Sequence, residues 1–137
     1  MIDRYTRPRM SAIWDLQHKY EIWLEVELQA CAAFERGGQI PRGTSARIRK
    51  KAKIDVARIA EIEKVTKHDV IAFLESLMDS VGPEHRFLHM GLTSSDIVDT
   101  SLAVQMTEAL DLILEDLNEL IAVLKKRALE HRHTVMV

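Results

Sequence analysis

Hydroxyl side chains gather in the segment "GLTSSDIVDTS", residues 91–101, where a long helical pattern begins. Thr93 and Ser94 stand beside Ser95, and Asp96 follows Thr93 at the spacing of a helix capping box. One hydroxyl suffices as a cap, and the first helical turn also offers unpaired N–H groups and partial positive charge. The other hydroxyls could therefore help to bind a carboxylate or a phosphate, although redundant capping is the competing interpretation.

Two histidines could add acid–base chemistry to such a site. His68 lies between Lys67 and Asp69, at the start of another helical pattern. His89 lies four residues before Thr93. A carboxylate beside an imidazole can fix its tautomer, and histidine titrates near neutral pH, so these residues suit proton transfer on an anionic substrate. The competing interpretations are that His68 caps a helix and that His89 packs in a linker.

Metal binding and thiol chemistry are weaker alternatives. His85 and His89 have the spacing of a metal-binding pair on a helix, but Pro83 and Gly91 argue against a regular helix there. With no clear third ligand, we expect no metal site. Cys31 is the only cysteine and falls on an apolar helical stripe, so we expect it to be buried rather than catalytic.

These residues must be positioned by helices, because the apolar residues recur at helical spacing and strand-forming residues never cluster. The pattern predicts helices over residues 11–36, 44–52, 55–64 and 66–81. Their expected caps are Thr44 or Ser45 for the second and Asp55 for the third, and Gly82 is expected to end the fourth. From residue 95 to 132 no proline or glycine interrupts the pattern, which predicts a helix of about 55 Å. We therefore expect an all-α fold.

A broad apolar band runs along the longest predicted helix, and the shorter helices could not cover it. We therefore expect further helices from other chains or from another part of the protein, and self-association of this chain. The members of the band are Val98, Met106, Leu110, Ile113, Leu114, Leu117, Leu120, Ile121, Leu124 and Ala128.

Composition excludes several classes of partner. The formal net charge is −2, both signs are interspersed, and the densest basic cluster, residues 47–51, is short, so we expect no nucleic acid. No apolar run approaches the roughly 18 residues of a membrane span, and the first residues lack the apolar core of a signal peptide. We expect no membrane partner and a cytoplasmic location.

Taken together, the segments resemble the adenylosuccinate lyase family of the fumarase/aspartase superfamily over essentially the whole chain. The starting stretch and "KHDVIAF" are typical of this family, whereas "GLTSSDIVDT" is shared more widely across the superfamily. The matching stretches are "RYTRPRMSAIW", "WLEVELQACAAFERGGQIP", "EIEKVTKHDVIAFLESL", "HMGLTSSDIVDTSLA" and "LKKRALEHRHTVMV".

The resemblance implies a cofactor-free β-elimination of fumarate from adenylosuccinate, which leaves AMP, and from succinylaminoimidazole-carboxamide ribotide. It implies an N-terminal helical domain over residues 1–92 and, over 93–137, the first long helix of a central helical bundle. It also implies a homotetramer whose active sites are assembled from several subunits.

Roles for individual residues follow from the same resemblance. Arg4 and Tyr5 match the family's contacts to the nucleotide phosphate. Lys67, His68 and Asp69 match its substrate-binding "KHD" segment. His68 is placed there to assist proton transfer or to orient the reacting group.

Three further positions match the cleft, and one departure matters. Thr93 and Ser94 match the hydroxyls that hold the succinyl or fumarate carboxylate, and His89 matches a histidine lining the same cleft. In the family, a Gly-Arg-Thr-His segment with the principal acid histidine and a later loop with the base serine follow the final stretch, "HRHTVMV". This chain contains neither, so we expect a fragment without lyase activity of its own.

Two other interpretations stay open. One is a sister lyase acting on argininosuccinate or aspartate, although Arg4, Tyr5 and the "KHD" segment argue against it. The other is a non-catalytic helical assembly module in which the hydroxyls only cap the helix.

Overall fold

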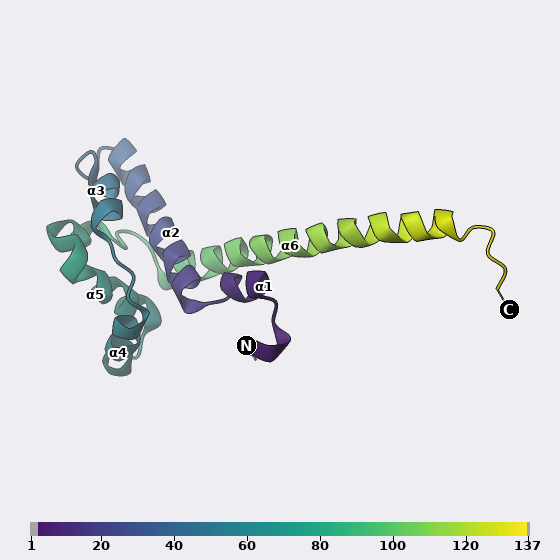
Figure 1. Ribbon diagram of the computed structural model, residues 1–137. Coiled ribbons are helices and arrows are strands. Elements are labelled where there is room, and N and C mark those ends of the chain that lie inside the picture. Colours follow the sequence, from purple (N-terminus) through teal and green to yellow (C-terminus); the bar gives the residue numbers. More distant parts are fainter. Residues whose placement is uncertain (1–2, 137) are drawn as a thin grey trace.

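The computed structural model describes residues 3–136, and every regular element in that range is a helix (Figure 1). This confirms the all-α fold predicted from the periodicity. Two of the elements, η1 and η2, are short 3-10 helices. The bounds are η1 (Asp3–Tyr5), α1 (Pro8–Ile13), α2 (Leu16–Arg36), α3 (Thr44–Lys51), α4 (Val56–Thr66), α5 (Asp69–Val81), η2 (Gly82–Phe87) and α6 (Ser94–Glu130).

Helices α2 to α5 pack into a compact body, and α6 leaves this body as a long rod with α1 alongside it (Figure 1). Three aromatic rings lie at the centre of the body and join α2 to α5. Trp23 meets Tyr20 and Phe73 edge to face, with ring centroids 5.3 and 5.5 Å apart. Tyr20 stacks on Phe73 at 5.8 Å. Such pairs add about 1 kcal/mol each beyond the burial of their surface, so this cluster is a main anchor of the fold.

The helix predicted over residues 11–36 is two helices, so this part of the prediction was wrong. Pro8 starts α1, because a proline at the first helical position loses only an N–H that would be unpaired anyway. The chain then breaks at Trp14 and Asp15. Asp15 Oδ1 accepts a hydrogen bond from the His18 N–H at 2.7 Å and so caps a new helix, α2.

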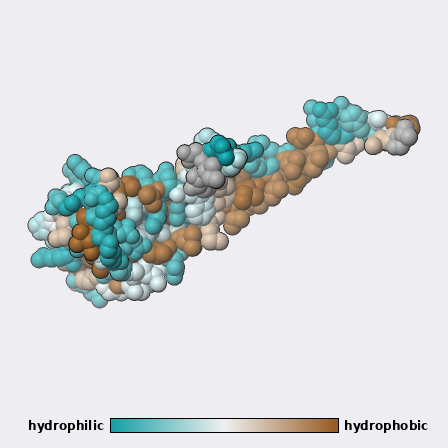
Figure 2. All heavy atoms as spheres, turned by 90° about the horizontal axis from the view of Figure 1, so that it is seen from below, coloured by the Kyte–Doolittle hydropathy of each residue, from teal (hydrophilic) through white to brown (hydrophobic). Residues whose placement is uncertain are grey.

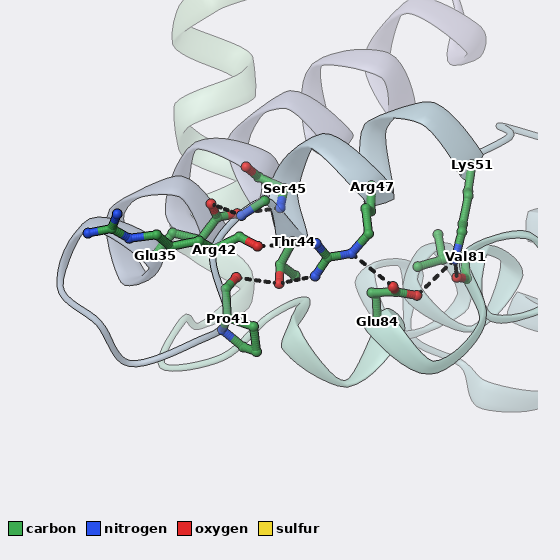
Figure 3. Close-up of polar contacts among 10 residues, drawn as sticks. Glu35, Pro41, Arg42, Thr44, Ser45, Arg47, Lys51, Val81 and Glu84 are labelled. Carbon is green, nitrogen blue, oxygen red and sulfur yellow. Dashed lines mark hydrogen bonds and ion pairs between the residues drawn. The ribbon is translucent and has the colours of Figure 1, made fainter.

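The start of α3 is capped by a side chain of α2 and not, as predicted, by Thr44 or Ser45. The carboxylate of Glu35 accepts hydrogen bonds from the N–H groups of Ser45 and Gly43 (Figure 3). These bonds, the Ser45 bond above all, lower the pKa of Glu35. The Thr44 hydroxyl instead donates to the Pro41 carbonyl at 2.7 Å and accepts from the Arg47 guanidinium at 3.0 Å.

The predicted cap at Asp55 and the predicted stop at Gly82 are confirmed. Asp55 Oδ1 accepts the N–H three residues further on at 2.9 Å and caps α4. Gly82 ends α5 with φ +72°, a left-handed conformation that glycine adopts at little cost. Just beyond it, Glu84 accepts hydrogen bonds from Lys51 at 2.9 Å and Arg47 at 3.1 Å, which ties η2 to α3 (Figure 3).

Helix α6 is continuous over 37 residues, as predicted. Its first part, residues 94–109, is called the packed half here because it lies against α1 and α2. The Trp23 indole N–H donates to Ser101 Oγ at 2.8 Å, and the Gln105 amide donates to the Ile13 carbonyl at 2.6 Å. The buried positions of the packed half are Ile97, Ser101, Gln105 and Ala109.

Residues 110–130 of α6, the bare half, include no buried residue. Figure 2 shows their apolar side chains as a continuous brown stripe along the rod. The predicted apolar band is therefore uncovered by any described residue over most of its length. None of the described helices combines the length and the apolarity that crossing a lipid bilayer requires. The large side chains of this stripe, each 45–60% exposed, are Ile113, Leu114, Leu117, Leu120, Ile121, Val123, Leu124, Leu129 and, at its start, Leu110.

Candidate functional site

The "KHD" residues form the tight turn between α4 and α5. Lys67 ends α4 in a left-handed conformation, φ +53°, and its side chain borders an open hollow of about 410 Å³ beside Glu63 and Lys64. His68 is the N-cap of α5, because its Nδ1 accepts the Ile71 N–H at 3.4 Å. The capping interpretation of His68 is thus confirmed, and a histidine can cap and still present its other nitrogen to a ligand.

The backbone, rather than Asp69, selects the tautomer of His68. Asp69 Oδ1 lies 3.6 Å from His68 Nδ1, which is too long for a hydrogen bond, and accepts the Val70 N–H at 2.8 Å instead. Since Nδ1 accepts a hydrogen bond from the Ile71 N–H, the neutral ring carries its proton on Nε2. The group that His68 offers outward is therefore an N–H donor.

The first turn of α6 supplies the partner of that donor. Ser94 Oγ lies 3.4 Å from His68 Nε2, so two segments distant in the sequence meet at this point. Thr93 and Asp96 form the predicted capping box, in which Asp96 Oδ2 accepts the Thr93 N–H at 2.7 Å. The hydroxyls thus divide their tasks: Thr93 belongs to the cap, while Ser94 faces the imidazole.

His89 lies in the turn before α6 and is held by α2. Its backbone has φ +58°. Its N–H donates to Glu27 Oε2 at 2.6 Å, and its Nδ1 lies 2.7 Å from Glu27 Oε1. Glu27 itself is fully buried. His89 therefore has a fixed position, although no hydrogen bond joins it to His68 or Ser94 within residues 3–136.

Arg4 and Tyr5 lie in η1, apart from the other candidate residues. The Arg4 guanidinium stacks over the Tyr5 ring at 4.8 Å, and both side chains are exposed. The residues that follow run along α6, with Arg7 bonded to Asp116 at 2.7 Å. In the described part of the chain, neither Arg4 nor Tyr5 forms a hydrogen bond with Lys67, His68, Asp69, His89, Thr93 or Ser94.

The residues considered for metal or thiol chemistry have structural contacts. His85 Nε2 bonds the Leu74 carbonyl at 2.7 Å, while His89 faces Glu27, so the two imidazoles have different partners. Residues 3–136 contain no group of three potential metal ligands. Cys31 is buried as predicted, and burial raises the pKa of its thiol to about 11, which keeps it protonated at neutral pH.

Glu27 is the residue that the sequence analysis missed. It lies four residues after Trp23 and four before Cys31, on the buried stripe of α2. A carboxylate at such a position needs hydrogen-bond partners, since an unpaired buried charge is very costly. An acidic residue in register with an apolar stripe was therefore a usable signal.

Sequence comparisons place the chain among known lyases. A family model described as "Lyase" matches residues 3–137. The adenylosuccinate lyases of Bacillus subtilis and Synechocystis sp. are 45% and 48% identical to this chain over 137 residues. Each alignment covers 100% of this chain and 32% of the relative, so the chain spans about a third of the length of the curated relatives it matches.

Solved structures agree with this placement. The 3-carboxy-cis,cis-muconate lactonizing enzyme of Pseudomonas putida matches 95% of this chain and 32% of its own, with a TM-score of 0.85 and 28% identity. A fumarate lyase from Mesorhizobium sp. matches 76% of this chain and 25% of its own, with a TM-score of 0.69 and 25% identity. Since the family model matches all but the first two residues, the chain belongs to the Lyase family, with adenylosuccinate lyases among its relatives.

Proposed function

We propose that this chain is the N-terminal third of an adenylosuccinate lyase. The whole enzyme would eliminate fumarate from adenylosuccinate, leaving AMP, and from succinylaminoimidazole-carboxamide ribotide. The observation that carries the proposal is the 3.4 Å approach of Ser94 Oγ to His68 Nε2, because it joins the "KHD" turn to the hydroxyl-rich start of α6. Identities of 45–48% to adenylosuccinate lyases over 100% of the chain support this choice of substrate.

The chemistry of these groups suits a substrate with several negative charges. The first turn of α6 offers N–H groups and partial positive charge to a carboxylate, and Ser94 adds a hydroxyl. Lys67 contributes a cation, and the Nε2–H of His68 can donate to a substrate oxygen or nitrogen. In this proposal His68 assists proton transfer or orients the reacting group, Thr93 and Ser94 hold a carboxylate, and neither a metal nor a cofactor takes part.

Arg4 and Tyr5 require more than one chain in this scheme. Both side chains are exposed, and within residues 3–136 neither is hydrogen-bonded to His68 or Ser94. An arginine that binds a phosphate donates two N–H groups to its oxygen atoms and therefore needs an accessible guanidinium. We assign them to a site that another copy or another part of the protein completes. His89 and Asp69 are assigned to the same substrate cleft as His68.

The bare half of α6 is the proposed interface with copies of the same chain, in a homotetramer. Its apolar stripe is large enough to need a cover. Charges along it also favour antiparallel pairing, because Asp111, Glu115 and Glu119 precede the basic run at residues 125–127. In this proposal residues 1–92 form the helical domain and 93–137 begin the central bundle. The cytoplasmic location stays a prediction.

A chimera tests the proposed function. This chain would replace the matching third of the Bacillus subtilis enzyme, and loss of adenylosuccinate would be followed by absorbance. We expect turnover of adenylosuccinate, none of argininosuccinate or aspartate, and none by the 137-residue chain alone. In the chimera, His68→Gln should lower kcat by about 100-fold or more, the scale of acid–base catalysis, with little change in melting temperature.

The alternatives predict other results. A sister lyase would turn over argininosuccinate or aspartate when its chimera with the corresponding enzyme is assayed. For an assembly module, the double change Thr93→Ala and Ser94→Ala would lower stability and leave substrate binding unchanged. Our proposal expects the reverse, namely weaker substrate binding in a folded protein. An adenylosuccinate chimera that folds as a tetramer but has no activity would contradict it.

A further inference from the structure

Glu27 is a buried carboxylate whose hydrogen bonds, among residues 3–136, all go to His89. It is 0% exposed and lies among the apolar residues of α2. Burying a carboxylate is unfavourable unless both oxygens are bonded, and a merely structural position would be filled more favourably by an apolar side chain. Oε2 accepts the His89 backbone N–H at 2.6 Å, and Oε1 lies within hydrogen-bond distance of His89 Nδ1, at 2.7 Å. These two contacts of Glu27 therefore hold both the backbone and the ring of His89 in place.

We propose that Glu27 is a positioning residue that fixes the tautomer and the place of His89, so that Nε2 of this histidine meets the substrate as a hydrogen-bond or proton acceptor. The proposal rests on the proposed lyase function for its catalytic consequence. The contacts between Glu27 and His89 lie within this chain and do not depend on the lyase function.

The tautomer follows from the chemistry of the two groups. An ionised carboxylate only accepts hydrogen bonds, so Nδ1 of His89 must carry the proton that lies between them. The neutral imidazole then has its lone pair on Nε2. No group within residues 3–136 bonds that nitrogen, and the side chain is 24% exposed. Nε2 is thus the ring atom left for a ligand.

The hydrogen bond from the His89 N–H to Glu27 fixes the backbone from which the imidazole projects. His89 has φ +58°, in the left-handed region that residues other than glycine seldom occupy. The bond from its N–H to Glu27 helps to hold this conformation, and the bond from Nδ1 then sets the direction of the ring. One buried side chain thereby controls both the main chain and the imidazole, as the outer partners of functional histidines commonly do.

The two histidines of the site are consequently complementary. His68 has its Nδ1 bonded to the Ile71 N–H and presents an Nε2–H donor, whereas His89 presents an Nε2 acceptor. A pair of imidazoles with opposite tautomers can give a hydrogen bond to one substrate atom and accept one from another. That division would be lost if Glu27 did not dictate the state of His89.

The substitution Glu27→Gln should invert the tautomer without emptying the site. Glutamine keeps one oxygen, which the His89 backbone N–H requires, so its NH₂ group must face Nδ1. Nδ1 then has to accept, and the proton moves to Nε2. Long-range ¹H–¹⁵N NMR of the histidine-labelled chain at about pH 8.5, above the usual titration range of histidine, reads this directly. His89→Asn assigns the signal by its loss.

We expect a protonated Nδ1 on His89 in the wild-type chain and a protonated Nε2 in Glu27→Gln. Glu25→Gln removes a partly exposed carboxylate that lies on the same helix as Glu27 and pairs with Arg49 of α3, and it should leave the His89 signal unchanged. An unprotonated Nδ1 in the wild-type chain would overturn the proposal, and that outcome does not depend on the folding of a Glu27 variant. So would an unchanged tautomer in a folded Glu27→Gln chain.

The catalytic consequence is measured in the chimera described above. Glu27→Gln should lower kcat/KM by about tenfold, the value of one well-placed hydrogen bond, and should have no further effect in a His89→Ala background. Equal losses with and without the imidazole would mean that Glu27 acts only on the fold, and would overturn the positioning role. If the wild-type chimera is inactive, the proposed function fails, but the NMR measurement still decides whether Glu27 sets the tautomer.

Discussion

Within α6, the packed half buries four side chains against the rest of the chain, whereas the bare half buries none. Apart from Ile97, the packed half does this with small or polar residues, and the side chains of Ser101 and Gln105 are hydrogen-bonded to α2 and α1. The bare half has large apolar side chains that stay mostly exposed, with contacts to the N-terminal segment only near its start. Apolarity along the sequence and burial within this chain are therefore separate properties. A strongly apolar stripe of α6 is thus left exposed by the described residues.

The comparison has an energetic consequence. A helix in a protein draws most of its stability from tertiary packing of its apolar face rather than from its intrinsic helix propensity. The packed half obtains that support from α1 and α2. The bare half must obtain it from association, if the proposed interface is correct. The same substitution should therefore have different effects in the two halves.

An isoleucine-to-alanine change in each half gives the largest expected difference. Ile97 is fully buried and Ile113 is 45% exposed. Ile97→Ala should lower the free energy of unfolding by about 3 kcal/mol, through lost burial and a residual cavity. Ile113→Ala should change it by less than about 0.5 kcal/mol when the chain is dilute enough to be monomeric. Urea unfolding followed by circular dichroism measures both, and equal effects would remove the distinction between the halves.

A charge placed in the bare half should have the next largest effect, on association rather than on folding. Leu117→Glu sets a carboxylate into the apolar stripe, and burying it in an interface should cost about 2 kcal/mol, or roughly 30-fold in Kd. Sedimentation velocity over a range of concentrations reports the shift towards monomer. Leu16→Glu, which introduces the same charge at an exposed leucine of α2 outside the stripe, is the matched control. A wild-type chain that stays monomeric at all concentrations would contradict the proposed interface.

Much of this fold followed from local patterns in the sequence. The long helix, the cap at Asp55 and the stop at Gly82 each depend on residues close together in the chain, which local propensity describes well. The cap of α3 did not, because Glu35 reaches it from another helix. The packed face of α6 was also missed. Its members Ser101 and Gln105 are polar, so an apolar pattern passes over them.

The sequence predicted which segments form the candidate site, but not how these segments lie relative to one another. Residues 67–69 and 93–94 were singled out by type and spacing, and the contact between His68 and Ser94 joins those two segments. Their meeting depends on how α5 and α6 pack, which no local pattern specifies. Glu27 lay outside the prediction for a related reason, since its role depends on a turn 62 residues away in the sequence. The roles of these residues in catalysis stay predictions.

The smallest expected effect concerns the ion pairs that connect the start of the chain to the bare half. Arg7 bonds Asp116 and Arg9 bonds Glu115, each at 2.7 Å, and all four side chains are at least half exposed. Exposed pairs of this kind contribute little, because solvent screens them and two long side chains lose freedom in forming them. Asp116→Asn should therefore lower the free energy of unfolding by less than about 0.5 kcal/mol, and high salt should abolish the difference. Asp111→Asn, an exposed acid without an ion pair in the described part of the chain, is the control. A loss above about 1.5 kcal/mol for Asp116→Asn alone would show that the bare half is held by the chain's own N-terminal segment, and would weaken the contrast between the two halves of α6.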